Sequence, residues 1–156
     1  MRLLKTNSLV KAEIGYVYKY LCDLDNLYND INYLKENNEV KVVRTECGVE
    51  FIGKKKELLF KMVNIEYKNN YGVRLKVITE GKHLKRFGNA DIICHLSYAN
   101  NTTNIETVVM TDKTPRIIWR AFIKLMVFIY MFQPRNIEKA YIKRIEEQFR
   151  SRSNKS

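Results

Sequence analysis

Few side chains in this chain of 156 residues have the type and spacing that catalysis or metal binding requires. The two histidines, His83 and His95, form no HExxH or similar ligand pair, so we predict no metal and no cofactor. Cys94 precedes His95, but adjacent residues of a strand point to opposite faces, which excludes a simple Cys–His nucleophile pair. The chain also contains no GxSxG motif, P-loop or GxGxxG motif. We therefore predict no catalytic residue.

Two further groups of charged residues have spacings that suggest chemistry. Asp23 and Asp25 stand two residues apart, and residues at this spacing do not face each other on a helix, so we expect them to end one helix or cap the next. The run Lys54-Lys55-Lys56, together with Lys82, Lys85 and Arg86, fits part of a phosphate-binding surface. Nucleic-acid binding normally interleaves exposed aromatic residues with such charges. Because most of the ten tyrosines fit amphipathic faces, nucleic acid is the less favoured partner.

The net charge of +11 is concentrated in the last third of the chain. From Lys113 onward there are 11 Lys and Arg against three Glu. This excess suits an anionic membrane face, with a solvated face that only keeps the protein soluble as the alternative. The odd number of cysteines and the lack of a secretory signal pattern favour a reducing compartment, so we predict a cytoplasmic protein with peripheral membrane contact as an option.

One segment, Ile117–Phe132, is apolar at every position except Arg120 and Lys124. A helix that is apolar almost all round is buried in protein or in lipid. Sixteen helical residues span roughly 24 Å, which is short of a hydrocarbon core of about 30 Å. We therefore expect this segment to cover a large apolar surface rather than to cross a membrane.

The order of predicted elements places this segment against a sheet. Residues 3–12 read as a strand, and a helical pattern from Ile14 is broken or bent by the Asp- and Asn-rich stretch 23–30. Strands follow, and the clearest segments are 40–45, 57–66, 72–79, 89–98 and 103–111. Within 89–98 the apolar positions alternate onto one face. After Pro115 the period becomes helical, Pro134 interrupts it, and residues 136–150 continue as an amphipathic helix.

This order resembles the helix-grip superfamily of START-like, polyketide cyclase/dehydrase and lipid-transfer proteins (SRPBCC). The local similarities are the entry Ser8–Glu13 followed by Val17–Leu24, the hairpin Asn101–Thr107 and the closing helix Asn136–Phe149. The resemblance implies an α+β fold in which a curved antiparallel sheet wraps around a long C-terminal helix, with one or two short helices after the first strand. It implies one START-like domain over residues 1–150, and we predict a disordered basic tail over 151–156.

The resemblance also implies a cavity between sheet and helix that holds a small apolar ligand, such as a lipid, an isoprenoid-like or a polycyclic molecule. The residues expected to line it are Leu75, Val77, Ile92, Cys94, Leu96, Ile105, Phe122, Met126 and Tyr130. The residues expected to meet a membrane surface are Arg116, Arg120 and Lys124. For each lining residue, simple core packing is the alternative.

Three functional classes remain open. The first is binding or transport of the apolar ligand, and the second is a cyclase, dehydrase or hydrolase that uses the same cavity. Acid–base catalysis needs titratable groups on the cavity side of the strands, and the apolar alternation of 89–98 places none there, which favours binding. The third is an anionic-polymer binder that acts through the basic surface. The oligomeric state is not predicted.

Overall fold

The computed structural model describes residues 2–34, 40–68, 71–80, 88–112 and 134–154. Its elements, in chain order, are β1 Arg2–Val10, α1 Ile14–Cys22, α2 Leu24–Leu34, β2 Lys41–Arg44, β3 Gly48–Ile52, β4 Leu58–Lys68, β5 Gly72–Thr79, β6 Ala90–Ala99, β7 Thr102–Thr111 and α4 Pro134–Ser153.

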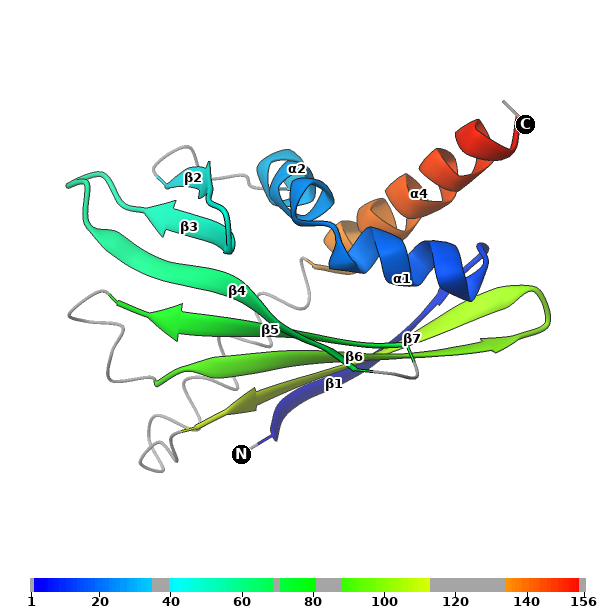
Figure 1. Ribbon diagram of the computed structural model, residues 1–156, viewed down its shortest axis with the longest axis horizontal. Helices are drawn as coiled ribbons and strands as arrows, with labels where there is room; N and C mark the ends of the chain where they lie inside the picture. The colour runs from blue at the N-terminus through cyan, green and yellow to red at the C-terminus, as the bar shows by residue number, and fades with distance from the viewer. Residues whose placement is uncertain (1, 35–39, 69–70, 81–87, 113–133, 155–156) are drawn as a thin grey trace.

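The seven strands form one antiparallel sheet in the order β1-β7-β6-β5-β4-β3-β2. Strands β2 to β7 follow one another as a meander, whereas β1 pairs with β7 at the far edge, with Val10 opposite Thr103. Figure 1 shows the sheet as strongly twisted and curved, with α1, α2 and α4 all on one of its faces. The two edges of the sheet are therefore both built by the first 44 residues.

Local turn chemistry explains several boundaries. Asn100 and Asn101 join β6 to β7 with φ angles of 52° and 59°, and this left-handed region is one that Asn tolerates better than most residues. Asp23 ends α1, and its Oδ1 accepts hydrogen bonds from the backbone N–H groups of Asp25 (2.8 Å) and Asn26 (3.4 Å). Asp23 therefore caps α2, as predicted.

The hydrophobic core lies between the helices and the part of the sheet nearest to them. Its buried members come from β1, α1, the link between them, β6, β7 and α4, and they are Val10, Ala12, Val17, Tyr20, Leu96, Ile105 and Ile145. Ile145 is 0% exposed and anchors α4 in this cluster. The alternation of β6 reflects this packing, because Leu96 is buried while His95 and Ser97 on either side are exposed.

The predicted fold class is confirmed: the chain is an α+β helix-grip structure with two short helices after the first strand. The strand predicted over 72–79 has these same limits in the structure, whereas β3 had no separate prediction.

The segment Ile117–Phe132 lies outside the described residues. One boundary was wrong: α4 continues to Ser153, so the first residues of the predicted disordered tail are helical. No helix in the described part of the chain has the length and apolarity needed to span a membrane.

Candidate functional site

The helix-bearing face of the sheet carries a continuous apolar surface across β5, β6 and β7. Leu75 of β5 lies opposite Ile92 of β6, and Val77 lies opposite Ala90. Ile92 in turn lies opposite Val109 of β7, and Leu96 lies opposite Ile105. Because directly opposed residues of an antiparallel pair share a face, these side chains form one surface with the core residues.

This surface divides into two regions along the strands. The helix-covered half contains Leu96 and Ile105, which are 8% and 5% exposed and belong to the core cluster with α1 and α4. The distal half contains Leu75, Val77 and Ile92, which are only partly buried and lie outside that cluster. Of the six predicted lining residues that are described, two are therefore core residues, and three lie on the sheet beyond the core.

The sixth residue, Cys94, stands at the boundary between the two halves. Its side chain packs against the core cluster, and its Sγ lies 3.6 Å from the Oγ1 of Thr107. Burial raises the pKa of the Cys94 thiol, so the thiol stays protonated at neutral pH and is a poor nucleophile. His95 is exposed on the opposite face, which confirms that the two residues form no Cys–His pair.

A buried polar cluster joins the three helices, and we call it the Asp30 cluster: Tyr20 of α1, Asp30 of α2 and Arg144 of α4. The Tyr20 hydroxyl donates to both Asp30 carboxylate oxygens at 3.0 and 2.8 Å. The Arg144 Nε donates to Asp30 Oδ1 at 2.8 Å. Only 3% of the Asp30 side chain is exposed, against 24% for Arg144. One carboxylate thus holds α1, α2 and α4 together.

Burial dominates the electrostatics around the Asp30 cluster. It raises the pKa of the Asp30 carboxyl, while the hydrogen bond from Tyr20 and the charge of Arg144 act in the opposite direction. Burial and the neighbouring carboxylate also raise the pKa of Tyr20 and of Tyr141, whose ring lies edge-on to that of Tyr20 with centroids 6.2 Å apart. The carboxylate already accepts hydrogen bonds from two donors, Tyr20 and Arg144, so this arrangement suits helix positioning better than proton transfer.

The Asp30 cluster was not predicted from the sequence. The spacing of Asp23 and Asp25 resembles that of a carboxylate pair, but these two residues lie near the surface. The signal that was available is weaker: Asp30 falls on the same side of its helix as Leu27, three residues earlier, where a charged residue is unexpected. Nothing in the local sequence points to Arg144, which is 114 residues away.

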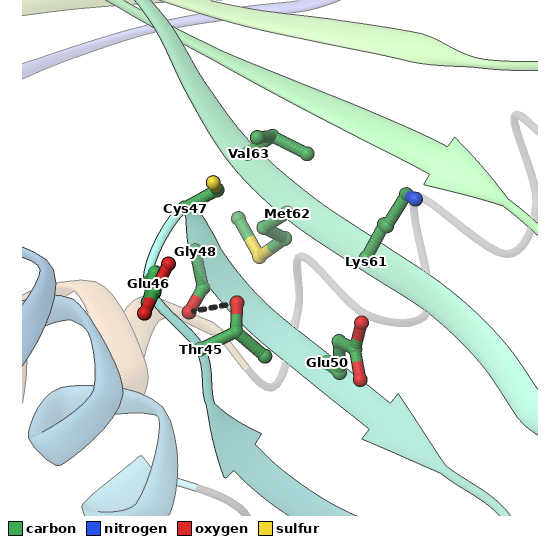
Figure 2. A pocket seen from close by; sticks show the side chains of 8 residues that line it. All are labelled: Thr45, Glu46, Cys47, Gly48, Glu50, Lys61, Met62 and Val63. Atoms are coloured by element: carbon green, nitrogen blue, oxygen red, sulfur yellow. Dashed lines mark hydrogen bonds between the residues drawn. The ribbon is translucent and has the colours of Figure 1, made fainter.

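A cavity of about 410 Å³ lies outside this surface, beside β3 and β4 (Figure 2). Its lining residues are Thr45, Glu46, Cys47, Gly48, Glu50, Lys61, Met62 and Val63. At Gly48 an added Cβ would lie 1.9 Å from the Met62 carbonyl oxygen, so only glycine lets β3 approach β4 here. The Thr45 hydroxyl donates to the Gly48 carbonyl at 3.1 Å and closes the turn. None of the predicted lining residues belongs to this cavity.

A second hollow, of about 690 Å³, is lined by residues of α2 and of the edge strand β2. An ion pair between Asp25 and Arg44 spans it, with 3.0 Å between the Arg44 Nε and Asp25 Oδ1. It too contains none of the predicted lining residues.

Six predicted residues cannot be placed in this geometry. Phe122, Met126 and Tyr130, expected on the helix side of the cavity, lie outside the described residues, as do Arg116, Arg120 and Lys124, expected at a membrane surface. Within the described ranges, no group of three or more His, Cys, Asp or Glu side chains is arranged to hold a metal ion.

The architecture is similar to that of several solved structures, although no protein-family model and no curated protein matches the sequence. A point mutant of norcoclaurine synthase from Thalictrum flavum, in complex with a transition-state analogue, superposes with a TM-score of 0.61 at 14% identity, covering 93% of this chain and 94% of that one. The same enzyme in complex with dopamine and hydroxybenzaldehyde gives 0.58 at 12% identity, covering 93% and 86%. A conserved protein from Geobacillus kaustophilus gives 0.59 at 17% identity, covering 92% and 94%.

Identities this low establish shared architecture and nothing about activity. The coverage shows that the similarity extends over nearly the whole of each chain. The resemblance drawn from the order of elements is thus confirmed at the level of the fold: this chain has the helix-grip fold of that superfamily.

Proposed function

We propose that this protein binds a small apolar ligand, such as a lipid, an isoprenoid-like or a polycyclic molecule, on the helix-bearing face of the sheet. The observation that carries the proposal is the distal half of that face. Leu75, Val77 and Ile92 extend the core surface along the strands but are only partly buried. Burying apolar area gains roughly 25 cal/mol per Å², so a ligand that covers these side chains is stabilised there.

From the division of the surface we propose roles for the described lining residues. Leu75, Val77 and Ile92 provide the wall that contacts the ligand. Cys94 marks the inner limit, because Leu96 and Ile105 beyond it already pack against α1 and α4. Phe122, Met126 and Tyr130 remain predicted contacts from the helix side.

Binding is favoured over catalysis because of the chemistry of this wall. Leu75, Val77 and Ile92 carry no titratable group, and the thiol of Cys94 has a raised pKa. The buried carboxylate nearest the core, Asp30, is occupied by Tyr20 and Arg144. A fold shared with norcoclaurine synthase keeps a cyclase- or dehydrase-type enzyme as the alternative, and product formation on the same ligand would identify it.

The test uses two neighbouring isoleucines that point to opposite faces. Ile92→Asn places an amide in the proposed wall, whereas the matched control Ile93→Asn places it on the other face of β6. Native mass spectrometry of the protein purified from its host should show a co-purifying apolar ligand. A fluorescent apolar probe should bind with saturation, and only Ile92→Asn should weaken it, by about tenfold or more. Absence of saturable binding, or equal loss in both variants, would contradict the proposal.

We further propose that the ligand is collected at an anionic membrane surface. The net charge of +11 supports this, since each basic side chain near such a surface contributes about 1 kcal/mol. Arg116, Arg120 and Lys124 remain the predicted contacts. Flotation with anionic liposomes at low salt should carry the protein upward, and no flotation at low salt would refute this second step.

A further inference from the structure

The β3–β4 hairpin turn presents three consecutive lysines at one end of the sheet. Lys54, Lys55 and Lys56 are all exposed. Two backbone hydrogen bonds close the turn, from Gly53 N–H to the Glu57 carbonyl (2.9 Å) and from Lys56 N–H to the Gly53 carbonyl (3.0 Å). Three positive charges are thus fixed on a short, tightly closed turn.

Position 56 of this turn has a backbone conformation that other residue types adopt more easily than lysine. Lys56 has φ 59°, in the left-handed region that Gly and Asn adopt most readily. The β6–β7 turn has the same requirement and meets it with Asn100 and Asn101. A lysine at position 56 therefore makes the turn less stable than glycine or asparagine would. Nothing in the fold requires the positive charge of this side chain.

The β3–β4 turn lies at the same end of the sheet as the distal half of the proposed ligand surface. Figure 1 shows the β3–β4 hairpin at one end of the sheet and the β6–β7 hairpin at the other. Thr79, two residues beyond Val77, ends β5 opposite Phe60 of β4, close to this turn. The distal half thus lies toward the basic hairpin, and the helix-covered half lies toward the neutral one.

We propose that Lys54, Lys55 and Lys56 dock this end of the protein on an anionic phospholipid bilayer. A bilayer fits better than nucleic acid because the charges sit on one turn, flanked by Gly53 and Glu57, rather than along a groove with stacking aromatics. Docking would bring the distal half toward the source of an apolar ligand. Docking rests on the membrane step proposed above and names the residues that perform it, but it does not depend on the apolar ligand, because it is measured without ligand.

The test compares two triple variants with the same change in net charge. Lys54, Lys55 and Lys56 are replaced by Gln in the first, and the exposed Lys11, Lys19 and Lys139, near or on the helices, in the matched control. Flotation uses phosphatidylcholine vesicles with and without phosphatidylserine. The hairpin variant should bind the anionic vesicles on the order of 100-fold more weakly, and the control should lose far less. Equal losses, or no loss, would overturn the proposal.

A single variant separates charge from folding. Lys56→Gly should raise the melting temperature, because glycine relieves the left-handed strain, and should still weaken vesicle binding severalfold. The proposal would be overturned if Lys56→Gly raised both the melting temperature and the affinity for vesicles. It would also be overturned if the hairpin region bound single-stranded RNA more strongly than vesicles. Release from vesicles by millimolar inorganic phosphate at constant ionic strength would identify a free-phosphate site instead. Binding of the apolar probe in solution should be unchanged in the hairpin variant, so ligand binding and membrane docking fail independently.

Discussion

The helix-covered half and the distal half of the sheet face are built from the same strands with the same alternation of residues. Leu96 and Leu75 illustrate the difference: both are leucines on this face, but Leu96 is 8% exposed within the core cluster, and Leu75 is half-buried outside it. The strands therefore do not decide which residues become core. The helices held by the Asp30 cluster do, because they cover only one end of the surface.

The largest expected effect tests what holds the helices over the covered half. Asp30→Asn removes the charge that pairs with Arg144 and one acceptor for Tyr20. Breaking a buried pair leaves an uncompensated charge, so we expect a loss of about 4 kcal/mol in the free energy of unfolding, measured with urea. A loss below about 1 kcal/mol would show that packing alone positions the helices.

The next effect compares the two leucines directly. Leu96→Ala creates a cavity in the core and should lower the free energy of unfolding by about 3 kcal/mol. Leu75→Ala should lower it by only about 1 kcal/mol, because its side chain is partly exposed, yet it should weaken binding of the apolar probe. Equal losses of stability in Leu96→Ala and Leu75→Ala would contradict the division of the surface into a core half and a ligand-binding half.

The pH dependence of the free energy of unfolding tests the helix-covered half. Burial raises the pKa of Tyr141 in the folded state, so above pH 10 the unfolded chain releases a proton that the folded chain keeps. Stability from this group is complete below the ordinary pKa near 10 and is lost as the pH rises, by about 1.4 kcal/mol per pH unit. Tyr141→Phe should flatten this alkaline loss in urea unfolding measured from pH 8 upward. An unchanged slope would contradict the assignment.

The smallest effect is expected at the surface, between α2 and the edge strand β2. Arg44→Gln breaks the ion pair with Asp25, whose side chain is 75% exposed. Solvent screens such pairs, so the free energy of unfolding should change by less than about 1 kcal/mol. A loss as large as that of Asp30→Asn would mean that the hollow beside β2 is part of the helix-positioning system.

The sequence predicted the elements well where the signals are local. Alternation assigned the faces of β6, and the two asparagines at 100 and 101 located a turn whose φ angles are positive. The sequence could not predict that Leu96 is buried in the core while Leu75 is only half-buried. Alternation gives the face on which a residue lies and not what packs on that face. It also missed Asp30, because its partners come from α1 and from a helix more than 100 residues later.

The pairing of β1 with β7 has a consequence for how the chain reaches this fold. Strands β2 to β7 can form hairpin by hairpin as they leave the ribosome, but Val10 must wait for Thr103. At about 5 to 20 residues per second, that interval lasts roughly 5 to 20 s. Throughout it, β1 has no partner strand, whereas α1 gains β5 and β6 to pack against before β7 is made. We therefore expect the nascent N-terminal segment to be the stretch that most depends on chaperones during synthesis.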